Sequence, residues 1–153
     1  MDLTFKLGEL DCADVQVLLD LHWRAMNAAS PPDACHVLAL DGLRDPGLTF
    51  WSAREDGRLV AVGALNHLSD DHGEVKSMRT GPADTGCGIG AAMLAHIMAE
   101  ARRRGYRQVS LETGSTADFG PAIRLYERAG FVRCGPFGGY PAADFTIFMT
   151  LVP

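Results

Sequence analysis

The chain has 153 residues, of which 47% are hydrophobic and 22% charged, and its formal net charge is −5 at pH 7. This length fits one compact domain over residues 1–153 with a sizeable core, and the acidic balance argues against a nucleic-acid-binding surface. No apolar stretch approaches the roughly 20 residues that a membrane span needs, and the N-terminus lacks the cationic start of a signal peptide. We therefore predict a single cytoplasmic domain with no nucleic-acid or membrane partner.

The cysteines indicate a reducing compartment. Cys12, Cys35, Cys87 and Cys134 lie far apart in the chain and form no C-x-x-C pair. This spacing favours neither a zinc site nor a secreted disulfide framework. We expect four free thiols.

The N-terminal part of the chain predicts a strand followed by a helix. Residues 3–7 alternate like a strand, and Asp11 with Asp14 resembles a helix N-cap ahead of a helix over 15–26. The apolar positions of this helix recur at helical spacing: Val15, Leu18, Leu19 and Trp23. Prolines and glycines then leave room for only a short second helix near 33–43.

The hydrophobic period next changes to two residues, which predicts three strands. Residues 48–54 and 58–68 read as a hairpin joined by a tight turn at 55–57. A third strand is expected over 74–80. Simple alternation would place Glu74, Lys76 and Met78 on one face of that strand.

The remaining elements alternate between helix and strand. An amphipathic helix follows a glycine-rich loop and stops at Gly105. A strand over 107–113 and a helix over 119–130 follow, and two strands near 131–135 and 144–152 close the chain. The element order β-α-α-β-β-β-α-β-α-β-β predicts a mixed α/β (α+β) domain.

The glycine-rich loop predicts an anion-binding site. Gly86, Gly88 and Gly90 stand between a strand end and a helix start, where the first helical amides have no intrahelical acceptor and the helix dipole is positive. Glycines let the backbone approach an anion closely and leave the amides uncovered. A diphosphate is the expected ligand.

Two nucleotide-binding alternatives fit this loop less well. Residues 86–91 also satisfy a G-x-G-x-x-A dinucleotide fingerprint, with Glu112 near the place of a ribose-binding acid. However, half of the chain precedes the loop, and too few elements follow it for a doubly wound sheet. An NAD(P)-dependent oxidoreductase is therefore a minor alternative. A P-loop is excluded because no G-x-x-x-x-G-K-[ST] motif is present.

Over essentially its whole length the chain resembles the GNAT superfamily of acyl-CoA-dependent N-acetyltransferases. The family motif [Q/R]-x-x-G-x-[G/A] has its counterpart in "TGCGIG" (85–90), and "AIRLYERAGF" (122–131) is close to a full match of the second family motif. The resemblance implies a GNAT fold with a central mixed, mostly antiparallel, splayed sheet of about six or seven strands flanked by about four helices. It also implies a cytoplasmic acetyltransferase, and homodimers are common in this family.

The resemblance further implies acetyl-CoA as cosubstrate, with no metal. Loop amides would bind the coenzyme A diphosphate, and the preceding strand would pair with the pantetheine arm. The implied cofactor-binding residues are Met78, Arg79, Thr80, Thr85, Gly86, Cys87, Gly88, Ile89, Gly90, Ala91, Phe119, Ala122 and Tyr126.

Three of these residues depart from the family pattern. Thr85 replaces the usual Arg or Gln, Cys87 replaces a basic residue, and Phe119 replaces an asparagine. The first two remove positive charge beside the phosphates, so these departures bear on cofactor affinity. Cys87 also lies near a helix N-terminus, which favours a reactive thiol.

Acetyl transfer to an amine needs a base for the amine proton and an acid for the leaving thiolate. Tyr126 matches the family's proton donor, although it could also simply pack beneath the cofactor. Glu74 matches the glutamate base of histone-acetylating members by its spacing from the loop, while an ion pair with Lys76 is the alternative role. Glu112 is the second candidate base. Direct attack on the thioester is expected, since no acyl-carrying nucleophile stands out.

The histidines have weaker signals. His22 and His36 fall in the region that lines the acceptor side in this family, so either could touch substrate or merely pack. His67 and His72 with neighbouring acids could be drawn as a metal cluster, but a polar turn gives the same composition. His96 is expected to face solvent.

The acceptor is predicted to be a small-molecule or peptide amine. Its pocket should form from 27–36, the base of the splayed strands and the glycine-rich segment 135–145. Phe137 and Tyr140 in that segment suggest an aromatic lid, with an ordinary hairpin connection as the alternative. A non-catalytic acyl-CoA-binding module is a further alternative for the whole protein.

Overall fold

The computed structural model describes all 153 residues and contains one seven-stranded sheet in the order β1-β2-β3-β4-β5-β7-β6. The strands are β1 (Leu3–Leu7), β2 (Leu48–Glu55), β3 (Arg58–Ser69), β4 (His72–Thr80), β5 (Gln108–Gly114), β6 (Val132–Cys134) and β7 (Thr146–Leu151). All neighbours pair antiparallel except β4 and β5, which are parallel. The predicted mixed, mostly antiparallel sheet is confirmed.

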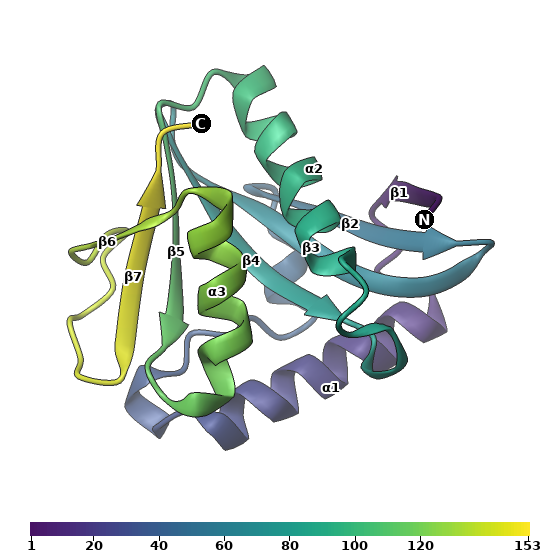
Figure 1. Cartoon of the computed structure of the whole chain (residues 1–153), viewed down its shortest axis with the longest axis horizontal. Helices are drawn as coiled ribbons and strands as arrows, with labels where there is room; N and C mark the ends of the chain where they lie inside the picture. Colours follow the sequence, from purple (N-terminus) through teal and green to yellow (C-terminus); the bar gives the residue numbers. More distant parts are fainter.

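Three α-helices cover the sheet: α1 (Ala13–Ala29), α2 (Ile89–Arg104) and α3 (Gly120–Ala129). The helix α1 lies against one face, and α2 and α3 lie against the other (Figure 1). On the α1 face, Val15 and Leu18 pack against Phe50 and Val62. None of the helices combines the length and the apolar content that crossing a bilayer requires.

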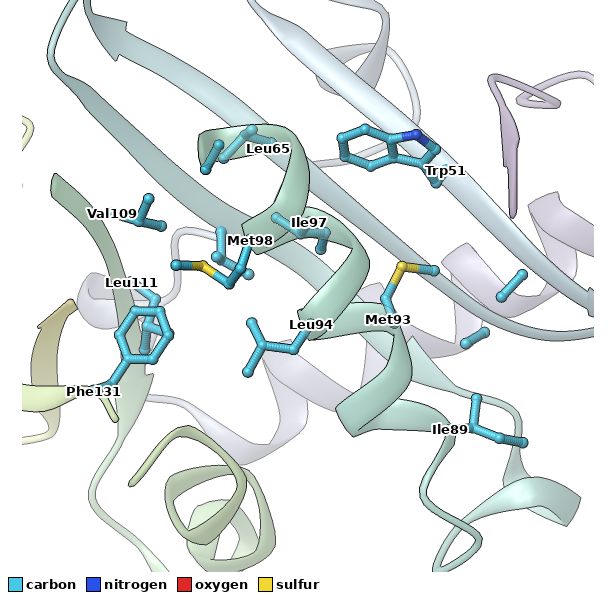
Figure 2. Packing of buried hydrophobic residues seen from close by; sticks show 14 of the residues in the cluster. Trp51, Leu65, Ile89, Met93, Leu94, Ile97, Met98, Val109, Leu111 and Phe131 are labelled. Carbon is cyan, nitrogen blue, oxygen red and sulfur yellow. The ribbon is translucent and has the colours of Figure 1, made fainter. Parts of the chain in front are cut away.

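The helix α2 supplies the centre of the larger core. Its apolar side chains project toward the sheet, as Figure 2 shows for Met93, Leu94, Ile97 and Met98. They meet buried residues from β2, β3, β5 and the segment after α3: Trp51, Leu65, Val109, Leu111 and Phe131. Gly105 ends the helix at a φ of 80°, as its position in the sequence predicts.

The parallel pair β4–β5 is short. It holds only three residue pairs, which run from His72 opposite Gln108 to Glu74 opposite Ser110. Beyond Glu74 the two strands diverge, with α3 standing over the divergence (Figure 1). The splayed sheet expected from the family resemblance is therefore present.

A bulge in β4 overturns one prediction from simple alternation. Between the pairs Ala64–Lys76 and Val62–Arg79, β4 has one more residue than β3, and Ser77 adopts a φ of 54°. The extra residue shifts the alternation. Met78 consequently packs into the core beneath α2, not on the face of Glu74 and Lys76.

A fourth α-helix near 33–43 was also predicted, and this prediction is wrong. The segment contains only two 3₁₀ turns, Pro32–Ala34 and Gly42–Arg44. Proline at one end and glycine at the other leave too few residues to offset the cost of nucleating a helix.

The start and the exposed face of α1 differ from the prediction. Cys12, not an aspartate, is the N-cap, and its side chain makes no capping hydrogen bond. Asp11 instead pairs with Arg44, because an ion pair to another element competes with local capping. Trp23 is 42% exposed, while its neighbour His22 is buried on the sheet side.

His96 does not face solvent as predicted. Its ring stacks on Phe5 with centroids 4.1 Å apart and meets the edge of Trp51 at 5.1 Å. Burial in this aromatic group lowers the pKa of His96. The histidine thus joins α2 to β1, a packing role that helical spacing alone could not show.

Close packing of α2 on β3 depends on Gly63. A Cβ at this position would lie 2.9 Å from Cγ of Met93 and 3.0 Å from Cδ1 of Ile97. We predict that Gly63→Ala lowers the free energy of unfolding by about 1–3 kcal/mol, measured by urea denaturation, because overpacking forces α2 away from the sheet. Gly135→Ala, where nothing lies within 4 Å, is the control and should change little.

Candidate active site

A cavity of about 840 Å³ opens where β4 and β5 diverge. Its walls come from α1, the segment 34–37, β4, the loop before α2, the end of β5 and α3. Segments far apart in the chain thus meet at one opening, because the parallel pair stops after three residues. Such a concave site between splayed strands is suited to a small-molecule ligand.

One end of the cavity is formed by bare backbone. Gly86 and Gly88 have φ angles of 77° and 81°, and a Cβ on either would meet only open space. The amides of residues 85–91 donate no hydrogen bond within the chain. Free amides at the N-terminus of a 16-residue helix suit an anion such as a diphosphate.

The loop is held in place from its N-terminal side. The buried carboxylate of Asp84 accepts two hydrogen bonds from Arg58, at 2.8 and 3.0 Å. The amide of Gly81 donates to the carbonyl of Val60 at 2.8 Å. These bonds tie the loop to β3, so its amides are oriented before any ligand arrives.

Most of the predicted cofactor-binding residues line this cavity: Met78, Arg79, Thr80, Thr85, Gly86, Gly88, Gly90, Ala91, Phe119, Ala122 and Tyr126. Two do not: the side chain of Cys87 is exposed at the loop surface, and Ile89 is buried in the core. Only their backbone amides belong to the loop. Phe119 meets Phe145 edge to face at 5.5 Å, and both close tightly over Gly114.

Tyr126 reaches the cavity from α3. Its ring packs against Phe131 at 6.0 Å, and its hydroxyl makes no hydrogen bond within the chain. Enclosure by the protein raises the pKa of the phenol to about 12, although the charge of Arg79 opposes that rise. The phenol therefore keeps its proton at neutral pH and can donate it.

Glu74 lies at the closed end of the cavity and is fully buried. One carboxylate oxygen accepts a hydrogen bond from Asn66 at 3.1 Å, and the other lies 3.4 Å from Nζ of Lys76. The alternative role weighed for Glu74, an ion pair with Lys76, is thus seen in the structure. Both oxygens are engaged by the protein.

His36 and Glu112 form a pair that the sequence did not indicate. Nδ1 of His36 lies 2.7 and 2.9 Å from the two carboxylate oxygens of Glu112. Burial raises the pKa of this carboxyl, and the hydrogen bond from His36 opposes the rise. An ionised carboxylate only accepts, so Nδ1 of His36 carries a hydrogen toward Glu112, and Nε2 makes no hydrogen bond within the chain. The two residues are 76 positions apart, so no local motif could have joined them.

The segment 135–145 closes over this pair. The ring of Tyr140 stacks on His36 with centroids 4.8 Å apart, and its hydroxyl lies 2.9 Å from Nζ of Lys76. Phe137 packs against Phe148 and His72, each at 5.6 Å. Phe137 and Tyr140 thus pack against neighbouring side chains beside the His36–Glu112 pair, and their role as a lid stays a prediction.

The other histidines have protein partners. His67 is hydrogen-bonded to Tyr106 and His72 to Ser110. The structure has no group of three or more His, Cys, Asp or Glu side chains arranged to hold a metal ion. His22 accepts a hydrogen bond at Nδ1 from Nε of Arg79, at 2.9 Å.

The sequence also matches a known family. Residues 15–131 match the model of the Acetyltransferase (GNAT) family. This chain belongs to that family. As a GNAT acetyltransferase it is an acetyl-CoA-dependent enzyme, in agreement with the resemblance carried by its two motifs and not with the oxidoreductase alternative.

Relatives and solved structures agree with this assignment. The enzyme is 45% identical over 145 residues to the N-acetyltransferase YsnE of Bacillus subtilis, which covers 95% of this chain and 96% of the relative. It is 40% identical over 148 residues to the N-acetyltransferase YedL of Escherichia coli, covering 97% and 93%. The fold matches an acetyltransferase of Bacillus subtilis in complex with CoA at a TM-score of 0.76 and 15% identity, over 99% of both chains.

The exposed thiol of Cys87 gives a first test of the loop. Cys87 is exposed and the other three cysteines are partly buried, so iodoacetamide should modify Cys87 first. Acetyl-CoA at about ten times its dissociation constant should slow this reaction about tenfold, because only about one molecule in eleven then has an uncovered loop. Peptide mapping with NADH as control checks this, and equal protection by both ligands would contradict it.

His22 gives a test of stability against pH. Burial, aided by the charge of Arg79, lowers the pKa of His22 from 6.5 to about 3. Between these values the unfolded chain binds a proton that the folded chain does not, so stability falls as pH falls below 6.5. From pH 7 to pH 5, His22 should cost about 2 kcal/mol of unfolding free energy.

Urea denaturation at the two pH values measures this loss. The control is His22→Asn, which keeps an acceptor near Nδ1 and has no proton to gain. Between pH 7 and pH 5 the free energy of unfolding of the wild-type enzyme should fall by about 2 kcal/mol more than that of the variant. Equal falls would show that His22 takes up a proton freely in the folded state.

Proposed function

We propose that this enzyme transfers the acetyl group of acetyl-CoA to the amine of a small molecule or peptide by direct attack. One observation carries the proposal: three kinds of group line a single cavity. These are the free amides of residues 85–91, the hydroxyl of Tyr126 and the His36–Glu112 pair. They correspond to an anion cradle, a proton donor and a proton acceptor.

The loop is proposed to bind the diphosphate of coenzyme A through backbone alone. Thr85 and Cys87 add no charge, so amide hydrogens and the helix dipole provide the attraction. Arg128 lines the cavity from α3 and provides an exposed positive charge nearby. Met78, Arg79 and Thr80 offer the unpaired edge of β4 to the pantetheine arm, since β4 pairs with β5 only up to Glu74.

His36 is proposed as the base, in preference to the originally predicted Glu74. An alkyl amine with a pKa near roughly 10 is mostly protonated at neutral pH and must lose a proton before it can attack. Nε2 of His36 makes no hydrogen bond within the chain and is the proposed proton acceptor, and Glu112 is positioned to stabilise the imidazolium that forms. The oxygens of Glu74 are already held by Asn66 and Lys76.

Tyr126 is proposed as the acid. The amine nitrogen forms a bond to the thioester carbonyl carbon, and the carbon–sulfur bond breaks. The attacking amine is the neutral form, and the proton that its nitrogen loses on forming the bond passes to His36, while the phenol of Tyr126 gives its proton to the departing sulfur. His36 then releases its proton to water and Tyr126 takes one back from water, which restores both side chains. The products are the N-acetylated amine and the free thiol of coenzyme A.

Detection of free thiol with a panel of amines tests the function directly. A transferase releases thiol from acetyl-CoA only when a suitable amine is present. An acyl-CoA-binding module would show a thermal shift with acetyl-CoA and no amine-dependent release. NAD(P) serves as the negative control in the thermal-shift measurement, because the enzyme is not expected to bind it.

Replacement of Tyr126 tests the acid. Tyr126→Phe keeps the ring in place against Phe131 and removes only the hydroxyl. We expect kcat to fall about 100-fold while the dissociation constant of CoA, measured by calorimetry, stays the same. An unchanged kcat would mean that the tyrosine only packs.

A pair of variants separates the two candidate bases. We expect His36→Gln to lower kcat about 100-fold, because it removes the proton acceptor. Glu74→Gln should mainly lower thermal stability, because it leaves Lys76 buried beside a neutral group. The opposite pattern would restore Glu74 as the base. Glu112→Gln keeps His36 but removes the charge beside it. We expect a smaller loss of kcat than for His36→Gln, together with a shift in the pH profile of kcat.

A further inference from the structure

Arg79 is a partly buried cation without a counterion in the chain. It lines the cavity from β4, and no carboxylate lies within ion-pair distance of its guanidinium. Its one hydrogen bond is from Nε to His22, which leaves the terminal nitrogens of the fork free. Burial lowers the pKa of this guanidinium, which indicates that its charge is poorly solvated.

His22 holds Arg79 without neutralising it. The pKa of His22 is lowered to about 3, so its ring is uncharged and Nδ1 acts as acceptor. The histidine therefore fixes the direction of the guanidinium and leaves its positive charge intact. Poorly solvated charges in proteins are usually paired, because an isolated one is costly. An anionic ligand is the partner that the cavity leaves room for.

The other cations nearby differ in this respect. Lys76 is paired with Glu74 and hydrogen-bonded to Tyr140. Arg128 also lines the cavity but is exposed, so water solvates it. Arg79 alone combines partial burial, a free fork and a place in the cavity wall.

The diphosphate of the cosubstrate is not the natural partner for this charge. Met78 and Arg79 are consecutive, and consecutive strand residues point to opposite faces. Met78 packs beneath α2, whereas Arg79 turns to α1 and His22. The free amides stand at the start of α2, whereas the guanidinium of Arg79 is held on the α1 side by His22, where its charge still acts on Tyr126.

We infer that Arg79 binds the carboxylate of the acceptor, so that the substrate class is amino acids or closely similar amino-carboxylates. This inference rests on the proposed acetyl transfer and adds its substrate class. A planar carboxylate matches the two free nitrogens of the guanidinium fork.

The closed end of the cavity favours the amine of such a molecule. Glu74 and Glu112 contribute two carboxylates there, against one lysine, Lys76. With two carboxylates against one lysine, this end attracts an ammonium group. Arg79 is positive and attracts the carboxylate. The cavity wall thus has the charge pattern of a zwitterion, with the proposed base His36 at its amine end.

The first experiment compares each standard amino acid with its own carboxamide as acceptor, by thiol release from acetyl-CoA. We expect at least one amino acid to exceed its amide in kcat/KM by about 100-fold, the discrimination typical of a desolvated charge pair. The same preference should appear in product inhibition, with the N-acetyl amino acid binding the CoA complex more tightly than its amide.

Variants then assign the preference to Arg79. Arg79→Gln should reduce the acid-to-amide ratio to within about threefold of unity, and Arg79→Lys should retain part of it. The amino groups of an amino acid and of its carboxamide differ in basicity. Comparing the acid-to-amide ratio of kcat/KM between variants cancels this difference, because it is the same in every variant. Arg133→Gln, on exposed β6, is the matched control and should keep the full preference. The dissociation constant of CoA should stay within about twofold in all variants.

Several outcomes would overturn the inference. One is an amide used as well as its acid by the wild-type enzyme; another is a preference that survives in both Arg79 variants. A weaker affinity for CoA with the preference intact would place the anion on the cosubstrate instead. If Arg79→Gln does not fold, wild-type kinetics and product inhibition still decide. Turnover of uncharged amines alone would leave acetyl transfer standing, whereas no turnover with any amine would remove both proposals.

Discussion

The early end of pairing between β4 and β5 is the constraint on which the site depends. The two parallel strands share three residue pairs and then diverge, so the sheet opens instead of continuing its ladder. That opening leaves one edge of β4 without a strand partner and gives the cavity its place. The bulge at Ser77 acts with it, because the shifted alternation sends Met78 toward α2 and Arg79 toward α1.

A sheet that opens in its middle must be stabilised elsewhere. Two apolar layers do this from opposite faces, the larger beneath α2 and the smaller beneath α1. Polar links add to them at the rim of the opening: Arg58 holds the loop through Asp84, and His22 holds Arg79. Tyr126 and Glu112 stand on a helix and a strand, and His36, on an irregular segment, is held by its hydrogen bond to Glu112. Groups held in this way need little reorganisation when ligands bind.

The features that could be predicted from the sequence are those set by residues close together in the chain. The glycine loop and the helix of Tyr126 are local patterns, and both were expected with nearly the right bounds. Met78 was assigned to the wrong face because one inserted residue reverses a two-residue period. The His36–Glu112 pair joins a loop to β5 across 76 positions of the chain. Nothing short of the folded topology could have brought them together.

The loop before α2 also has an evolutionary consequence. Its offered atoms are amide hydrogens, which every residue except proline possesses, so substitutions along the loop leave the donors where they are. Only Gly86 and Gly88 are tied to their identity, by positive φ. Ile89 is held by the core, whereas the exposed Thr85 and Cys87 can be replaced without removing a backbone donor. Backbone donors of this kind would let side chains at the acceptor end of the cavity change while the proposed contacts to coenzyme A stay the same.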